Sequence, residues 1–144
     1  MRLRLVPALH RATHGVALFL DATSPPLGLT QGECHLLAHL HEAGAAPVGV
    51  LHAAFAHKRS TLTSYLDRLE RAGLIRRALR PEDRRSFLVS LTAAGKAAAA
   101  KVHRRLARLE SAALSRMSAR DVRGFHAVLQ ALQEAAAETT RRKR

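Results

Sequence analysis

The chain has 144 residues, the length of one domain, and a hydrophobic fraction of 47%, which is enough for a buried core. It carries 24 Lys and Arg against 11 Asp and Glu, and the resulting net charge of +13 favours a polyanionic partner such as nucleic acid. A single cysteine, Cys34, excludes a disulfide framework and a cysteine-rich zinc module, and no apolar stretch is long enough to span a bilayer.

The N-terminus gives no sign of a secretory signal. Met1 to Arg4 carry positive charge, but neither an uninterrupted apolar run nor a small-residue cleavage site follows them. One cysteine in the whole chain fits a reducing compartment. We therefore expect a cytoplasmic protein with no membrane partner.

The positive charge is unevenly distributed along the chain. Residues 1–46 carry three basic and three acidic side chains, whereas residues 47–92 carry nine and four, and residues 93–117 carry six and one. Residues 118–144 carry six and three. The first third is therefore neutral, and we expect the middle of the chain to face a polyanion.

Alanine and leucine dominate the composition and aromatic residues make up 3%, so helices are favoured over sheets. Apolar residues at helical spacing predict a first helix over about residues 4–21. The segment 24–28, Ser-Pro-Pro-Leu-Gly, ends it. Thr30 and Glu33 then form a capping box, which predicts the start of a second helix that ends by Gly44.

Two more helices are predicted in the next segment. Pro47 is suited to the first position of a short third helix, over about residues 47–55. Residues 57–72 predict a fourth helix, with Gly73 just after its end. Its buried stripe consists of Leu62, Leu66 and Leu69. Its opposite face presents hydroxyls and guanidinium groups, those of Arg59, Ser60, Thr61, Thr63, Ser64 and Arg68.

A β-hairpin is predicted next, with strands at residues 74–79 and 87–91. The second strand alternates, so we expect Phe87, Val89 and Leu91 to face the same way. Between the strands lies a charged turn, residues 80–86. Such a turn is by itself most often a solvated loop.

Two long helices are predicted to complete the chain. Thr92 can cap a helix of about 25 residues, with an apolar stripe that runs to Met117. Ser118 with Asp121 can cap a last helix. This last helix has a seam suited to pairing with another helix, formed by Val122, Phe125, Leu129, Leu132 and Ala136.

The order of these elements is the pattern of a winged helix-turn-helix. A DNA major groove admits one α-helix, and hydroxyls and arginines on its outer face can reach base edges and phosphates. A basic hairpin beside that helix can place an arginine in the narrow minor groove, where the negative potential is enhanced. The predicted fold is therefore mainly α, with a small β-hairpin wing and a helical dimerisation region.

The chain also resembles the MarR family of transcriptional regulators. The resemblance is carried by four motifs in fixed order, Leu29-Thr30-Gln31-Gly32-Glu33, Leu69-Glu70-Arg71-Ala72-Gly73-Leu74-Ile75-Arg76-Arg77, Asp83-Arg84-Arg85 and Leu91-Thr92-Ala93-Ala94-Gly95. It implies a homodimer joined by residues 1–28 and 93–144, with a DNA-binding lobe at residues 29–92 that binds double-stranded, pseudo-palindromic operator DNA.

The resemblance further implies roles for individual residues. Arg85 is then the wing-tip residue that enters the minor groove, next to Arg84, and Asp83 is the carboxylate that orients it. Ser64 stands where many relatives carry Arg, which puts the usual DNA contact at that position in doubt. The family pattern also implies a repressor that is released by a small-molecule effector, whose identity no residue set specifies.

Other interpretations stay open at this stage. A basic protein that coats nucleic acid without sequence choice would share the charge, although it needs no hairpin or dimer seam. Four basic residues of the long helix are either a second phosphate-binding track or the solvated face of a dimer-forming helix: Lys101, Arg104, Arg105 and Arg108.

The sequence predicts no enzyme, cofactor or metal site. His10 and His14, like His35 and His39, are four residues apart and could share an ion, but neither pair has an evident third ligand. Cys34 beside His35 could sense an oxidant or a metal. No glycine-rich phosphate loop, nucleophile elbow or carboxylate pair in a recognisable motif is present.

Overall fold

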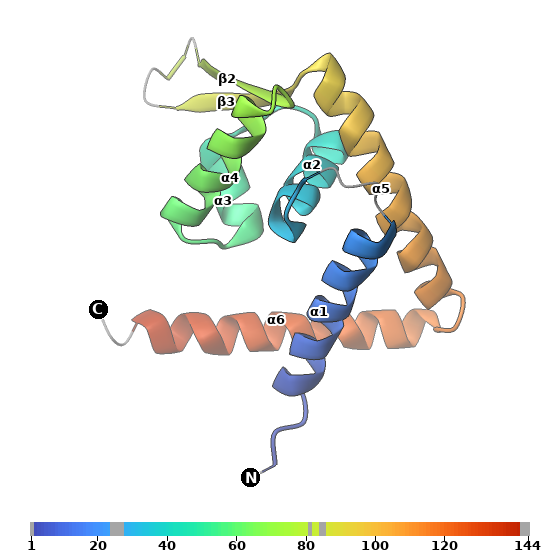
Figure 1. The fold of residues 1–144 in the computed structure, drawn as a ribbon. Helices are drawn as coiled ribbons and strands as arrows, with labels where there is room; N and C mark the ends of the chain where they lie inside the picture. The colour runs from blue at the N-terminus through green and yellow to red at the C-terminus, as the bar shows by residue number, and fades with distance from the viewer. Residues whose placement is uncertain (1, 24–27, 81, 84–85, 142–144) are drawn as a thin grey trace. The chain divides into compact units, whose positions relative to one another are not determined.

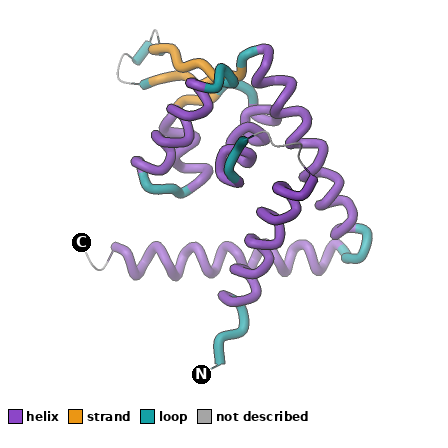
Figure 2. Tube along the Cα trace, in the orientation of Figure 1, coloured by secondary structure: helices purple, strands orange, loops and turns teal. Residues whose placement is uncertain are grey.

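The structure is a computed structural model, and it describes residues 2–23, 28–80, 82–83 and 86–141 (Figure 1). Helices dominate it, and three short strands form a single sheet (Figure 2). The elements are α1 (Val6–Thr23), α2 (Gln31–Ala43), β1 (Ala46–Pro47), α3 (Val48–Phe55), α4 (Arg59–Arg71), β2 (Ile75–Leu79), β3 (Phe87–Leu91), α5 (Ala93–Leu114) and α6 (Ala119–Arg141). The predicted fold class, mainly α with a small hairpin wing, is confirmed.

The predicted helix starts are confirmed by their capping contacts. At α2 the Thr30 hydroxyl accepts a hydrogen bond from the Glu33 amide, and Glu33 Oε2 accepts one from the Thr30 amide at 2.9 Å. At α6 the Ser118 amide donates to Asp121 Oδ2 at 2.8 Å. These contacts use backbone donors that the first helical turn leaves without partners.

The start of α3 differs from the prediction. Pro47 is the residue before the helix and not its first residue, because its backbone is extended and pairs with β3 as part of β1. The two-residue strand β1 was not predicted, since it is too short to show an alternating pattern. It extends the hairpin to a three-stranded antiparallel sheet of order β1-β3-β2.

The register of the hairpin explains why two residues of β3 differ in burial. Val89 is completely buried, whereas Phe87 is 45% exposed. Phe87 pairs with Leu79 at the end of the ladder that faces the turn, and Leu79 is exposed as well. The hairpin therefore extends beyond the core that it covers at its other end, which explains why Phe87 is exposed although it lies two residues from the buried Val89 in the same strand.

One core joins α2, α3, α4, the sheet and the start of α5. Its buried members are Leu36, Leu37, Leu40, Ala46, Leu51, Leu62, Leu66, Leu69, Ile75, Val89, Ala98 and Ala99. A smaller cluster contains Leu20 of α1, Cys34 and Ala38 of α2, and Val102 of α5. Because α2 contributes to both clusters, it lies between α4 on one side and α1 with α5 on the other.

The junction between the wing and α5 depends on a glycine. A Cβ atom at Gly95 would lie 1.7 Å from the Leu74 carbonyl oxygen, so only glycine fits there. The Thr92 hydroxyl accepts a hydrogen bond from the Gly95 amide at 3.0 Å and donates one to the Gly73 carbonyl at 2.6 Å. The capping role predicted for Thr92 is confirmed, and it ties α5 to the chain between α4 and β2.

The chain divides into two compact units, residues 1–106 and residues 107–144. The first unit contains everything from α1 to the first part of α5. In the second unit, α6 leaves Phe125 and Val128 exposed, while Val122, Leu129 and Leu132 are partly covered. In the described part of the chain, no helix combines the length and apolar character that a membrane crossing requires.

Candidate nucleic-acid interface

The outer face of α4 is polar and open to solvent. Leu62, Leu66 and Leu69 are buried, and they fix which side of the helix faces the core. The side chains of Arg59, Ser60, Thr63 and Ser64 are exposed, and Thr61 is half-buried. All six residues predicted for the DNA-facing surface of this helix, the exposed Arg68 included, are thus accessible or partly accessible.

The end of α4 is fixed by its backbone. Gly73 adopts a φ of 71°, which a glycine tolerates at no steric cost. Its amide donates to the Glu70 carbonyl, and the Leu74 amide donates to the Leu69 carbonyl, each at 2.9 Å. These two bonds form a Schellman motif, which satisfies carbonyl groups at the helix end and turns the chain directly into β2.

Arg77 of β2 fastens the wing to α4. Its Nε donates to Glu70 Oε2 at 2.9 Å, and its Nη2 donates to Asp67 Oδ1 at 2.8 Å. The hydrogen bonds from Arg77 hold the pKa of the Glu70 carboxyl below its ordinary value, and Glu70 in turn raises the pKa of the Arg77 guanidinium. The guanidinium of Arg77 thus forms its ion pairs within the fold, with Glu70 and Asp67. This role was not predictable from the sequence, because Arg77 and its partners lie on different elements.

Backbone hydrogen bonds join the described residues at the two ends of the wing's turn. The Arg80 amide donates to the Ser86 carbonyl, and the Ser86 amide donates to the Asp83 carbonyl, each at 3.0 Å. Asp83 is exposed in this turn. Arg84 and Arg85, predicted as the DNA-binding tip, lie outside the described residues, so their role stays a prediction.

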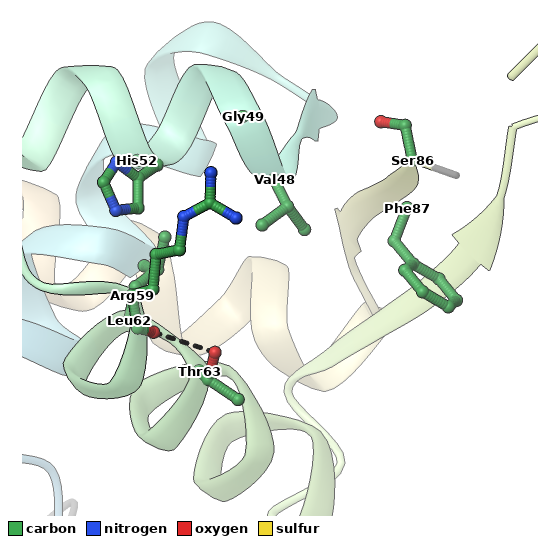
Figure 3. A pocket seen from close by; sticks show the side chains of 8 residues that line it. All are labelled: Val48, Gly49, His52, Arg59, Leu62, Thr63, Ser86 and Phe87. Atoms are coloured by element: carbon green, nitrogen blue, oxygen red, sulfur yellow. Dashed lines mark hydrogen bonds between the residues drawn. The ribbon is translucent and has the colours of Figure 1, made fainter. Parts of the chain in front are cut away.

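A cavity lies between α3, the first turns of α4 and the start of β3 (Figure 3). It encloses about 440 Å³, and its apolar walls include Val48, Leu62 and Phe87. Arg59 extends from α4 toward α3 in Figure 3, and the Thr63 hydroxyl donates to the Arg59 carbonyl at 2.8 Å. Among the described residues, no carboxylate pairs with the Arg59 guanidinium. Its positive charge is therefore available to an anion at this face.

Arg68 is placed differently from the other residues predicted on α4. Its Nε hydrogen-bonds Glu33 Oε1, and its guanidinium carbon lies 5.3 Å from the centre of the Tyr65 ring. Glu33 is only 2% exposed, so this is an ion pair with one buried member. A sequence signal for it existed: Glu33 occupies the position that begins the buried stripe Leu36, Leu37 and Leu40 of α2.

Cys34 and the two histidine pairs are the residues that could sense an oxidant or a metal. Cys34 is buried, and burial, followed by the negative charges of Glu33 and Asp21, raises the pKa of its thiol. A raised pKa disfavours the reactive thiolate. Burial lowers the pKa of His35. Within the described ranges, no group of three or more His, Cys, Asp or Glu side chains could hold a metal ion.

Comparison with known proteins adds a decisive observation. The model of the MarR family matches residues 29–87. The crystal structure of MarR is similar in fold, with a TM-score of 0.71 and 22% sequence identity. The similar region covers 95% of this chain and 93% of the MarR chain. Residues 29–87 therefore form a MarR-family domain. The match begins at Leu29 and ends at Phe87, so it contains α2, α3, α4, β2 and the turn of the wing.

Two further structures of the MarR type are similar over almost their whole length. The similarity to MepR in the S. aureus MepR–DNA complex covers 94% of this chain and 99% of the MepR chain, with a TM-score of 0.78 and 19% sequence identity. The similarity to PcaV from Streptomyces coelicolor, in complex with its natural ligand, covers 94% of this chain and 97% of the PcaV chain, with a TM-score of 0.76 and 22% sequence identity. No curated protein sequence is significantly similar to the chain.

The family match of residues 29–87 indicates the broad class of the protein. MarR-family proteins are winged-helix, DNA-binding regulators of transcription. The resemblance seen in the sequence motifs is thereby confirmed, and so is the winged-helix fold.

Proposed function

We propose that this MarR-family protein is a homodimeric repressor that binds a pseudo-palindromic operator and is released by a small-molecule effector. The observation that carries the proposal is the polar, exposed face of α4 beside a basic wing, on the side of the helix opposite to its buried leucines. In this proposal α4 enters the major groove, and the wing reaches the adjacent minor groove.

The site residues fall into two groups. On α4, Ser60, Thr61, Thr63 and Ser64 offer hydroxyls to base edges or phosphates, and Arg59 offers a positive charge from the cavity wall. On the wing, Arg85 enters the minor groove, Arg84 neutralises a phosphate, and Asp83 orients Arg85. Hydroxyl contacts are versatile because each oxygen can donate and accept hydrogen bonds.

The dimer is proposed to form through residues 1–28 and 93–144, while residues 29–92 bind DNA. Support comes from the apolar side chains that α1 and α6 leave exposed, among them Val6, Leu18 and Phe125. Apolar surface of this extent at helical spacing favours burial against a second copy. Homodimers are also typical of the family.

Support for an effector comes from the similar structure of PcaV, which contains that protein's natural ligand. The chemical identity of an effector for this chain is left open by its residues. A regulator of this kind acts on chromosomal DNA, so the cytoplasmic location expected from the sequence is part of the same proposal.

The test begins with selection of a binding site from genomic DNA. Affinity for the selected duplex and for a random duplex is then measured by fluorescence anisotropy over a range of salt concentrations. Log affinity should fall linearly with log salt, with a slope of roughly −7 if each of two lobes makes about four phosphate contacts. The selected duplex should bind more tightly at every salt concentration, and Arg85→Ala should reduce that preference.

Two results would contradict the proposal. A slope near zero on both duplexes would exclude nucleic-acid binding through this basic surface. A steep slope with equal affinity for the two duplexes would favour the second candidate function, a basic protein that coats nucleic acid without sequence choice. The net charge of +13 alone is compatible with that candidate.

A further inference from the structure

Among the described residues, Glu33 is the charged side chain that the core buries most completely, and both oxygens of its carboxylate have a hydrogen-bond partner. Oε2 accepts the hydrogen bond from the Thr30 amide that caps α2, and Oε1 pairs with Arg68. A buried carboxylate is costly unless it is paired and hydrogen-bonded. Arg68 therefore provides the charged partner that the buried Glu33 carboxylate of α2 requires. This ion pair competes with any contact that Arg68 could make to DNA.

The contact between the two helices extends over neighbouring residues. A Cβ atom at Gly32 would lie 2.5 Å from the Tyr65 ring, so the absence of a side chain at Gly32 makes room for that ring. Arg68 lies over the same ring, one helical turn further along α4. Two consecutive residues of α2, Gly32 and Glu33, thus contact Tyr65 and Arg68 of α4. This arrangement restricts both rotation of α4 about its axis and its translation along it.

The opposite flank of α4 is held by a separate contact. Arg77 of β2 binds Asp67 and Glu70, as described above. The exposed residues Ser60 and Ser64 lie between the two flanks, since a helix advances 100° per residue. A recognition helix must hold its side chains within about 0.5 Å and 10–20° of the productive geometry. The two flanking contacts are suited to impose that limit.

We infer that Glu33 and Arg68 are positioning residues, which set the orientation of the recognition helix, and that Arg68 does not contact the DNA. This inference rests on the proposed function of α4, and it revises the role that the sequence analysis assigned to Arg68. It also connects α4 through α2 to the cluster of Leu20, Cys34 and Val102, where α1 and α5 pack.

The two roles of Arg68 predict opposite results for Glu33→Gln. If Arg68 were a DNA contact restrained by Glu33, removal of the carboxylate charge would release it and tighten binding. If the pair positions α4, the same substitution should weaken binding to the selected duplex about tenfold, comparable to the loss of a base contact, and change affinity for a random duplex less than about twofold. A rise in affinity for the selected duplex would overturn the inference.

Arg68→Gln provides a second readout, the salt dependence of binding. Loss of a phosphate contact should make the slope of log affinity against log salt shallower by about 0.9 for each Arg68 in the complex. Loss of a positioning residue should leave the slope unchanged and reduce only the preference for the selected duplex. A shallower slope, or an equal loss of affinity on both duplexes, would overturn the inference. Arg71→Gln, which removes the same charge from an exposed position of α4, is the matched control.

The double variant Glu33→Gln/Arg68→Gln guards against a failure to fold. It leaves no unpaired buried charge, which Arg68→Gln alone does. For a positioning pair, the double variant should lose no more affinity than either single variant, because both substitutions remove the same interaction. Additive losses would refute the coupling. If the wild-type protein itself shows no preference for the selected duplex, the proposed function fails and not this inference, so the two failures are distinguishable.

Discussion

The Gly95→Ala substitution should strongly destabilise the first compact unit. The added Cβ atom would lie 1.7 Å from the Leu74 carbonyl oxygen, whereas real Cβ atoms essentially never come within 3.0 Å of a heavy atom outside their own residue and its chain neighbours. The obstacle is backbone and not a flexible side chain, so α5 or the start of β2 must move. That movement breaks the bond from the Thr92 amide to the Leu74 carbonyl and the bond from the Thr92 hydroxyl to the Gly73 carbonyl.

The magnitude follows from these losses. Two hydrogen bonds contribute about 1 kcal/mol each, and overpacking of a well-filled site costs about 1–3 kcal/mol, so the free energy of unfolding should fall by about 3–5 kcal/mol. The matched control is Gly15→Ala in α1, where no atom lies within 4 Å of the added methyl group. This control should be neutral or gain up to about 1 kcal/mol, because alanine favours a helix over glycine.

Urea denaturation followed by circular dichroism at constant protein concentration measures both variants. Equal stability of Gly95→Ala and the wild type, within about 0.5 kcal/mol, would refute the close approach of α5 to Leu74. A large loss in the Gly15→Ala control would show that the effect does not come from the contact at Gly95.

Three further predictions concern titration and assembly. Because Arg77 lowers the pKa of Glu70, that carboxyl stabilises the fold above its unfolded pKa of about 4.5, and the stabilisation is lost as the pH falls below it. Arg77→Gln should flatten this acid dependence in pH-dependent urea melts. Burial lowers the pKa of His35 below its ordinary value of 6.5, so at a given pH the unfolded chain binds a proton at His35 more readily than the folded chain does. Stability should therefore decline as the pH falls below 6.5. His35→Gln should remove this decline, and His14→Gln on the exposed side of α1 should not. Phe125→Glu should shift sedimentation at low micromolar concentration from dimer toward monomer, since a charge cannot be buried unpaired at an apolar seam; an unchanged dimer would exclude Phe125 from the interface.

The sequence predicted the helices well because their signals are local. The capping box at Thr30, the glycine after α4 and the seam of α6 are patterns within one turn or one stretch of helix, and their physical basis needs no other part of the chain. The hairpin was equally predictable from alternation and from its charged turn. Contacts between elements were not. The partners of Arg68 and Arg77 lie 35 and 7 residues away in the chain, on a different helix or strand, and nothing in a linear pattern pairs them.

For the residues proposed to contact DNA, too, the local features were predictable from the sequence and the contacts between elements were not. An exposed polar face on α4 was predictable from the buried positions of Leu62, Leu66 and Leu69, since the opposite face must be solvated. Which guanidiniums on that face are available was not predictable, because availability depends on buried carboxylates elsewhere in the fold. Arg68 pairs with Glu33, whereas Arg59 has no carboxylate partner among the described residues.

The separation of the two faces of α4 bears on how such a regulator can diverge. Ser60 and Ser64 are exposed and take no part in the core, while the helix is held by its leucines and by ion pairs on its flanks. Substitutions at these two serines therefore change what the helix can recognise with little effect on folding, since surface substitutions usually alter stability by less than about 0.5 kcal/mol. A duplicated copy of the gene could thus acquire a new target in single steps, each of which leaves a folded protein.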